Sequence, residues 1–257
     1  MSNTIETEHN ENIIKQFSKQ AVSFSKVKGH YDSVETIIAM SEVSQKDEVL
    51  DIACGVGILS CEFAKYAKSV IGVDITQKML DVAIQKQSLE KLKNIRFTLG
   101  NVQNLHYADN SFDIVFTRYS FHHFLDTKKV FTEMLRVCKP QGKIIVVDVA
   151  LEGKYADRYN FMEKLRDPSH TKALTFEEFD ELFAHKSLSN HQQSSYSVPM
   201  ELEKQLEASF PNEGDEEKLR EIFKNDLKTN SLGLHTSLKE NKIYFSYPIT
   251  IFIAEKL

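Results

Sequence analysis

The chain has 257 residues, of which 41% are hydrophobic and 27% charged, and its formal net charge is −5. This length suits one large α/β domain with an appendage, and no apolar run approaches the roughly 18 residues that a membrane-spanning helix needs. The chain has no long basic block, which argues against a nucleic-acid partner. Its three cysteines show no CxxC spacing, which argues against a disulfide framework and a zinc site. We therefore expect a cytoplasmic protein with no metal and no membrane span.

The first 43 residues are expected to lie outside the core. Residues 1–12 are polar and acidic, with no apolar stretch behind a basic one, so they predict a frayed tail rather than a secretory signal. Residues 10–43 have the pattern of two helices, with Gly29 and His30 near the break between them. We expect these two helices to pack over one end of a sheet.

Between residues 47 and 150, short β-rich runs alternate with helical patterns, which is typical of βαβ units and a parallel sheet. The predicted strands are Glu48–Ile52, Val70–Asp74, Ile95–Leu99, Phe112–Thr117 and Lys143–Val149. The helical stretches between them carry apolar residues at spacings of three and four, namely Leu59, Phe63 and Tyr66, then Leu80, Ala83 and Ile84, then Val130, Met134 and Val137. Pro140 and Gly142 end the third of these helices. Residues 44–150 are thus expected to form the core of the sheet.

Residues 151–257 are expected to complete the same domain. The patterns predict helices at Arg158–Arg166, at Phe176–Ala184 and from Met200 to about Lys228, and a polar strand at Leu188–Val198. Residues 242–254 read as a strand pair or as one long bent strand, in which Pro248 favours an edge position or a bulge. The helical segment at about 199–240 is placed to form a lid over an active site.

A glycine turn follows the first predicted strand, in the sequence VLDIACGVGILS. Gly55 and Gly57 fall where a helix begins, and glycine lets a ligand approach the backbone of such a turn closely. Asp74 ends the second strand, where a carboxylate can accept hydrogen bonds from both hydroxyls of a ribose. However, Asp51 precedes the turn, and Ser60 stands where a dinucleotide-binding turn has its third glycine. The turn is therefore poorly suited to a pyrophosphate.

Four segments in chain order carry a family resemblance: LDIACGVG, VIGVDIT, GNVQNLHYADNSFDIVFTRYSFHHF and EMLRVCKPQGKIIVVD. They resemble the successive motifs of the class I S-adenosylmethionine-dependent methyltransferases. The likeness is greatest to the branch that includes the ubiquinone and menaquinone biosynthesis methyltransferases, and it is strong over residues 47–150. The resemblance implies that the cofactor is S-adenosylmethionine and that S-adenosylhomocysteine is the product.

The resemblance also implies which residues bind the cofactor. They are Asp51, Ala53, Gly55 and Gly57 around the methionine end, Asp74 and Ile75 after the second strand, Asn101 and Val102 at the adenine edge, and Arg118. Asp74 matches the acid that binds the ribose. The chain departs from the family pattern at Ala53, where a glycine is common, and at Asn101, where an aspartate is common. Both departures are small, because an alanine methyl is small and an Asn side-chain carbonyl can still accept from an adenine amino group.

Methyl transfer requires an acceptor atom held in line with the methyl group, and a hydroxyl or acidic carbon must also lose a proton. His122 and His123 follow the fourth strand on the cofactor side of the predicted sheet, so one of them is the candidate base or substrate-orienting group. Arg118 is a second candidate for orienting an anionic acceptor. Structural roles explain these residues almost equally well. The candidate acceptor pocket comprises Arg166 and His170 in the segment RDPSH, together with Asp148.

Taken together, the sequence predicts a doubly wound α/β fold with a seven-stranded, mostly parallel sheet, N-terminal helices and a helical insert before the last strand. The predicted function is transfer of a methyl group from S-adenosylmethionine to an oxygen, carbon or nitrogen of a small molecule. Two alternatives stay open at this point. One is a non-catalytic S-adenosylmethionine-binding protein, and the other is a nucleotide-dependent dehydrogenase.

Overall fold

The computed structural model of the chain describes residues 2–24 and 33–257. Its elements are α1 (Ser2–Phe24), α2 (Val34–Ser41), β1 (Glu48–Ile52), α3 (Ile58–Ala64), β2 (Ser69–Asp74), α4 (Gln77–Leu89), β3 (Ile95–Leu99), β4 (Phe112–Arg118), the 3-10 turn η2 (Phe121–His123), α5 (Thr127–Val137), β5 (Cys138–Val149), α6 (Gly153–Arg166), α7 (Phe176–Phe183), β6 (Leu188–Glu201), α8 (Leu202–Ser209), α9 (Asp215–Thr229), β7 (Ser237–Lys239) and β8 (Lys242–Lys256).

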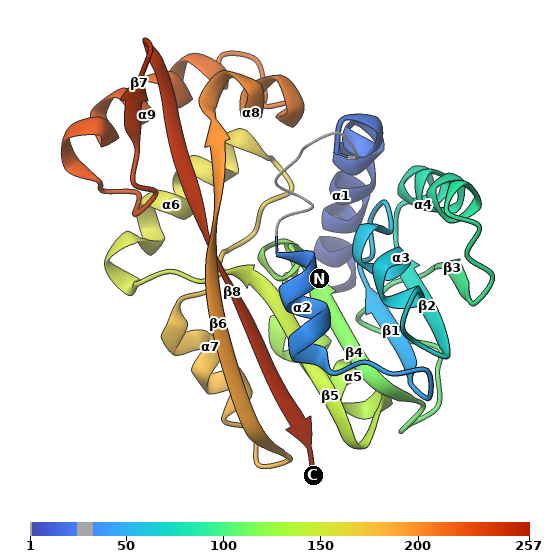
Figure 1. Cartoon of the computed structure of the whole chain (residues 1–257). Coiled ribbons are helices and arrows are strands. Elements are labelled where there is room, and N and C mark those ends of the chain that lie inside the picture. The colour runs from blue at the N-terminus through green and yellow to red at the C-terminus, as the bar shows by residue number, and fades with distance from the viewer. Residues whose placement is uncertain (1, 25–32) are drawn as a thin grey trace.

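The strands of the described chain form one sheet in the order β3-β2-β1-β4-β5-β8-β6, and the short β7 pairs with β8 outside this path (Figure 1). Strands β1 to β5 pair in parallel. Strand β8 runs antiparallel to both of its neighbours, β5 and β6. The predicted fold, a doubly wound and mostly parallel sheet of seven strands, is confirmed, and the short β7 adds an eighth strand. The carboxyl ends of β1, β2 and β4 meet at one edge, where such sheets bind ligands.

Hydrophobic residues cover both faces of this sheet. On one face, Phe63 of α3 and Tyr159 of α6 pack in a cluster with residues of α2, α8 and α9. On the other face, Met134 of α5 and Phe179 of α7 pack in a second cluster. The strands between them are Val- and Ile-rich and buried on both faces, as the parallel part of a sheet requires. The sequence thus predicts two layers of helices, and the structure has them.

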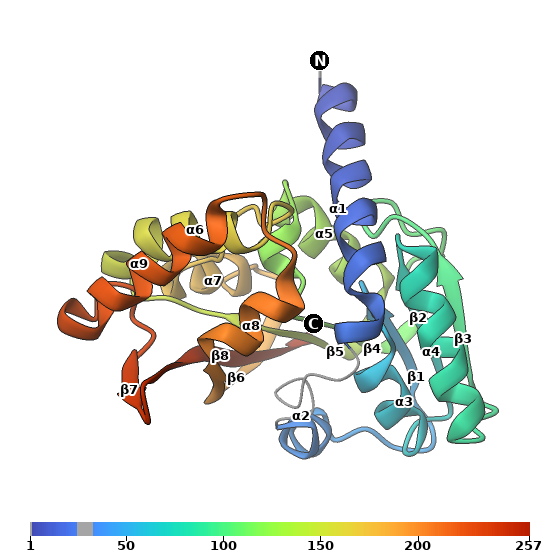
Figure 2. The same cartoon turned by 90° about the horizontal axis from the view of Figure 1, so that it is seen from above.

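Residues 2–12 lie in a helix, where the sequence predicted a frayed tail over residues 1–12. Helix α1 begins at Ser2 and lies between α4 and α8 (Figures 1 and 2). Its polar side chains reach backbone carbonyls elsewhere: His9 Nε2 lies 2.7 Å from the His123 oxygen, and Asn12 Nδ2 lies 3.0 Å from the Pro168 oxygen. Because these contacts are polar and long-range, no apolar periodicity reveals them. The predicted break at Gly29 and His30 lies outside the described residues.

In the C-terminal part, β8 is one long strand, as one of the two predicted alternatives has it. Pro248 was predicted at an edge position or a bulge, and it lies instead where one neighbouring strand ends. Strand β8 is interior, between β5 and β6, over Ile249–Glu255. Pro248 directly precedes this stretch, at the point where pairing with β5 ends, and its carbonyl accepts from the Ala150 N–H at 3.3 Å. Proline has no N–H to donate, but at this position it would donate toward β5, where the pairing already ends. The sheet therefore loses at most one hydrogen bond.

Smaller differences concern helix lengths. Helix α6 begins at Gly153, five residues before the predicted start at Arg158. Tyr66 and Ile84, predicted on apolar helix stripes, are 44% and 45% exposed. Tyr66 lies just beyond the end of α3 at Ala64. Among the described helices, none combines the length and apolar content needed to cross a bilayer.

Candidate active site

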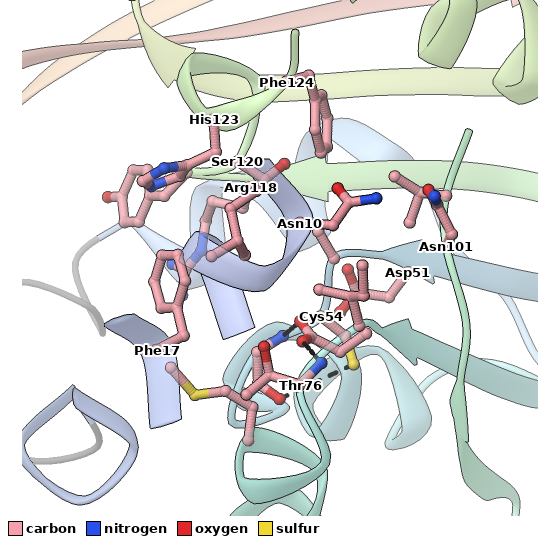
Figure 3. Close-up of a pocket in the computed structure, with 18 of the residues that line it drawn as sticks. Asn10, Phe17, Asp51, Cys54, Thr76, Asn101, Arg118, Ser120, His123 and Phe124 are labelled. Atoms are coloured by element: carbon pink, nitrogen blue, oxygen red, sulfur yellow. Dashed lines mark hydrogen bonds between the residues drawn. The ribbon is translucent and has the colours of Figure 1, made fainter. Parts of the chain in front are cut away.

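A first compartment lies at the carboxyl ends of β1, β2 and β4, with α1 across it (Figure 2). It is a cavity of about 1000 Å³, its open mouth included. The loop after β1, the ends of β2 and β4 and residues 101–103 supply most of its wall, and His9, Asn10, Ile13 and Phe17 of α1 complete it. Figure 3 shows Phe17 and His123 on one side of this cavity and Asp51, Cys54 and Thr76 on the other.

The glycine turn after β1 is held in a conformation that few side chains tolerate. Ala53, Gly55 and Gly57 have φ values of 54°, 53° and 71°. A Cβ added at Gly55 would meet nothing within 4 Å, so this backbone is open toward the cavity. A Cβ at Gly57 would lie 2.8 Å from the Phe97 ring and 2.9 Å from the Ala83 methyl. Gly57 is therefore needed for packing at the start of α3, and it does not line the cavity.

Asp74 fixes the turn to the end of β2. Its Oδ2 accepts from the Gly55 N–H and its Oδ1 from the Thr76 N–H, both at 2.8 Å. Burial raises the pKa of Asp74 against the lowering effect of these two hydrogen bonds. Each carboxylate oxygen can accept a further hydrogen bond, so the group still has capacity for two hydroxyls at the cavity wall.

Asp51 lies beside this turn, at the end of β1. It accepts a hydrogen bond from the buried Ser60 hydroxyl, so the residue that replaces the third dinucleotide-type glycine serves as the partner of Asp51. Burial raises the pKa of Asp51 to about 8, although the Ser60 hydrogen bond and the charge of Arg118 act in the opposite direction. Asp51 is thus a buried acid that a nearby positive charge would ionise.

The far end of the first compartment is lined by Ile75, Asn101 and Val102. The Asn101 Oδ1 accepts from the Gln103 N–H at 2.9 Å, and its Nδ2 lies 3.5 Å from the Glu6 Oε1. Arg118 lines the same compartment, and its guanidinium carbon lies 4.9 Å from the ring centre of Tyr119. All the predicted cofactor residues except Gly57 therefore line one cavity.

A second compartment of about 830 Å³, its mouth included, adjoins the first. Phe17, Tyr119 and His123 line both compartments and form the boundary between them. Most of the remaining wall comes from α6, α8, β6 and β8, which are far apart in the sequence. Tyr119 adopts a positive φ of 57° directly after β4, and its hydroxyl lies 2.9 Å from that of Tyr196. A strained residue at such a position is often found at functional sites.

His122 lines the second compartment and is oriented by an acid. Its Nδ1 lies 2.7 Å from the Asp148 Oδ1, while the other Asp148 oxygen accepts from the Phe121 N–H. Burial by itself would lower the pKa of His122, but the charge of Asp148 and its hydrogen bond outweigh burial, so the net shift is upward. Within the described chain, His122 Nε2 has no hydrogen-bond partner. Asp148 itself is buried behind the histidine and lines neither compartment.

The other two histidines are held neutral. His123 Nδ1 lies 3.2 Å from the Ser169 carbonyl oxygen, and burial lowers the pKa of His123 to about 3. His170 donates through Nε2 to the Asn160 Oδ1 at 2.7 Å, and burial lowers its pKa to about 2. His170 is 1% exposed and lines neither compartment. Its ring is packed behind His122, so the structure does not bring His170 to the wall of either compartment.

Arg166 does line the second compartment, with the neighbouring Asp167. Its Nε and Nη2 donate to the Glu163 Oε2 at 2.8 and 2.6 Å, and its Nη1 donates to the Ser209 hydroxyl at 3.2 Å. The other Glu163 oxygen accepts from the Tyr247 hydroxyl at 3.0 Å. The sequence analysis missed Glu163 and Tyr247, and it also missed the α1 residues, because no local pattern separates them from packing residues.

Comparison with known proteins agrees with this architecture. The family model described as "Methyltransferase domain" matches residues 44–226. An uncharacterized methyltransferase YcgJ of Bacillus subtilis is 33% identical over 189 residues, which are 72% of this chain and 75% of that protein. The crystal structure of YcgJ superposes with a TM-score of 0.81 at 28% identity, covering 88% of this chain and 99% of that one.

A demethylmenaquinone methyltransferase of Lactobacillus johnsonii is 33% identical over 144 residues, covering 49% of this chain and 59% of that protein. These matches decide between the functions left open by the sequence, and a nucleotide-dependent dehydrogenase is not among the families they support. The chain belongs to the methyltransferase-domain family and is a class I S-adenosylmethionine-dependent methyltransferase.

Proposed function

We propose that this enzyme transfers the methyl group of S-adenosylmethionine, by in-line displacement, to an oxygen, carbon or nitrogen atom of a small molecule. The cofactor occupies the first compartment, and the methyl acceptor occupies the second. One observation carries this assignment: the two compartments meet at a boundary made by Phe17, Tyr119 and His123. In-line transfer needs donor and acceptor side by side in such an arrangement.

The residues of the first compartment fit the cofactor. Asp74 binds the ribose, and Ile75, Asn101 and Val102 bind the adenine. The open backbone at Gly55 and the buried acid Asp51 receive the methionine end, as the resemblance to the family implies. Arg118 is placed to meet the cofactor carboxylate. Bound there, S-adenosylmethionine supplies a methyl group on a positively charged sulfur, which is already an activated donor.

His122 is the proposed base for an acceptor that must lose a proton. Its Nε2 accepts the proton from the acceptor hydroxyl, while Asp148 accepts from Nδ1–H and stabilises the imidazolium that forms. The acceptor oxygen then forms a bond to the methyl carbon, and the bonding electron pair of the breaking carbon–sulfur bond remains on sulfur. His123 is not suited to this task, because burial lowers its pKa to about 3, which makes it a weak base, and because its Nδ1 faces the Ser169 carbonyl. We assign His123 a positioning role at the boundary.

Helices α1 and α8 are the proposed cover that keeps water from the reacting atoms. Gln205, Ala208 and Ser209 of α8 line the second compartment, and Gln16 of α1 reaches the Phe210 carbonyl at 3.1 Å. Helix α9 instead packs on α6, away from both compartments. The lid predicted over about 199–240 is therefore assigned to α8, together with α1.

The proposal is tested by supplying the enzyme with S-adenosylmethionine that carries a trideuteromethyl group, together with a fractionated small-molecule extract. We expect mass spectrometry to find one compound that gains the labelled methyl group while S-adenosylhomocysteine accumulates in equal amount. The Asp74→Ala variant, assayed in parallel, should form neither product. Formation of S-adenosylhomocysteine only with protein or nucleic-acid fractions would contradict the small-molecule assignment.

A further inference from the structure

The second compartment carries several charged side chains, and their pairing determines which molecules it accepts. Arg166 is the cationic arginine in its wall, and Glu163 and Asp167 are the acids there. All three side chains are largely buried, with 14% exposure for Arg166 and 3% for Glu163. Buried charges interact strongly with a bound molecule, because little water screens them. The balance of these charges therefore matters more than their number.

Arg166 is already neutralised within the protein. Two of its N–H groups donate to one Glu163 oxygen, and a third donates to Ser209, so two of its five N–H donors remain. Tyr247 donates to the second Glu163 oxygen and keeps the carboxylate in place. An anionic ligand would have to share Arg166 with a carboxylate that binds the same guanidinium. A neutral carbonyl or hydroxyl can use the two remaining donors without this competition.

The other charges of the compartment do not favour an anion either. Burial by itself would raise the pKa of Asp167, but the charge of Arg166 and the hydrogen bonds from the Ser169 N–H and hydroxyl outweigh it and hold the pKa low. Its carboxylate therefore adds a negative charge. His122 is paired with Asp148, so a protonated imidazole brings no net positive charge. Among the described residues of the wall, Glu163 and Asp167 stand against Arg166, which gives this part of the wall a net charge of about −1 that repels an acidic ligand.

The rest of the wall suits an apolar body. Phe17, Tyr119, Tyr159 and Tyr247 contribute rings, and Val149, Val198 and Ile249 contribute aliphatic groups. Aromatic side chains that carry hydroxyls bind flat apolar molecules with a few polar atoms well. The compartment thus offers a mainly apolar surface, one base and an arginine whose charge is already balanced.

We propose that the methyl acceptor is an electrically neutral, largely apolar molecule, and that Glu163 determines this preference by neutralising Arg166. This inference rests on the proposed function, because it takes the second compartment as the acceptor site. Glu163 acts through Arg166 and is a specificity-determining residue rather than a catalytic one. Removing its charge while keeping its shape should make the compartment attract anions.

The test compares two ligands of nearly equal shape, para-hydroxybenzamide and para-hydroxybenzoate, whose affinities for the S-adenosylhomocysteine-loaded enzyme are measured by ligand-observed NMR. We expect the wild type to bind the neutral amide about tenfold tighter than the anion, a conservative figure for a buried charge. In Glu163→Gln the ratio should fall to about threefold or reverse, because Arg166 becomes available. The double variant Glu163→Gln, Arg166→Gln removes both charges and should restore the preference for the amide.

The affinity of each variant for S-adenosylhomocysteine, measured by calorimetry, serves as the control for a merely structural effect, and it should stay within about twofold of wild type. Equal binding of amide and anion to the wild type would overturn the proposal. So would an unchanged ratio in Glu163→Gln, or an absence of binding of both ligands to the loaded enzyme. In each of these cases intact S-adenosylhomocysteine binding would leave the proposed methyl transfer standing, whereas its loss in the wild type would count against the methyl transfer itself.

Discussion

The two compartments are built by different means, although they share a boundary. In the first, a backbone turn shapes part of the wall: Gly55 is open toward the cavity, and Asp74 fixes the turn through the Gly55 and Thr76 N–H groups. In the second, paired side chains shape the polar part of the wall: Glu163 holds Arg166, and Asp148 orients His122 from behind. A surface made by backbone suits one constant ligand, because few substitutions alter it. A surface made by side-chain pairs can change its ligand with a single substitution.

The largest expected effect concerns the backbone-lined compartment. Asp74→Ala removes the proposed acceptor for two ribose hydroxyls and releases the Gly55 and Thr76 N–H groups. Hydrogen bonds to a charged group contribute about 1.5–3 kcal/mol each, so we expect the affinity for S-adenosylmethionine to fall about 1000-fold or more. Calorimetry measures this, with Asp81→Ala on the exposed side of α4 as a matched control that leaves binding intact. Unchanged binding in Asp74→Ala would remove Asp74 from the cofactor site.

In the second compartment, the corresponding change affects chemistry and spares cofactor binding. His122→Asn keeps a donor for Asp148 in the place of Nδ1 but removes Nε2, so we expect kcat to fall about 100-fold or more with little change in cofactor affinity. In the wild type, activity should rise with pH through a pKa above the usual 6.5, because the base must be neutral. Asp148→Asn should shift this rising limb to lower pH. Full activity of His122→Asn would show that the histidine is not the base.

The neutral histidines predict a loss of stability in acid that originates near the second compartment. His123 and His170 have pKa values lowered to about 3 and 2, so the unfolded chain binds more protons than the folded one below about pH 6.5. The free energy of unfolding should therefore fall as pH decreases from about 6.5 to 3, by up to about 1.4 kcal/mol per pH unit for each histidine. His122 acts in the opposite window, since its raised pKa stabilises the fold below 6.5 and that contribution is lost at higher pH.

Urea unfolding at a series of pH values measures this dependence. His170→Gln keeps the donor to Asn160 and removes one titrating ring, so it should roughly halve the slope. The same change at the exposed His185 is the control and should leave the slope as it is. A stability that is constant between pH 6 and 4 would contradict the buried neutral state of these rings.

The smallest expected effect returns to the first compartment. Because burial raises the pKa of Asp51 to about 8, this acid is largely protonated at neutral pH in the free enzyme. A positively charged cofactor should ionise it and release up to about one proton at pH 7. Calorimetry in buffers of different ionisation enthalpy counts this proton, and Asp51→Asn should lower the count. The same count in both proteins would place the titrating group elsewhere.

How much the sequence predicts differs between the compartments for a physical reason. The residues predicted to bind the cofactor lie in short stretches at the ends of successive strands, where local spacing determines position, and all of them except Gly57 line the first compartment. The second compartment and its boundary join segments far apart in the chain: Tyr247 reaches Glu163 across 84 residues, and the boundary residue His123 is contacted by His9 of α1 across 114. Such contacts depend on how α1, α6, α8 and β8 pack, which no local pattern reveals. His170 is an example: the segment RDPSH predicted that it lines the acceptor pocket, but its ring is buried and lines neither compartment.

A crystal structure with S-adenosylhomocysteine tests the central claim most directly, namely that donor and acceptor meet at the boundary of Phe17, Tyr119 and His123. We predict that the ribose hydroxyls contact Asp74, that the adenine lies along Ile75 and Val102, and that the sulfur points across this boundary toward His122. A sulfur that faces away from the second compartment, or a ligand bound outside the first, would contradict the account.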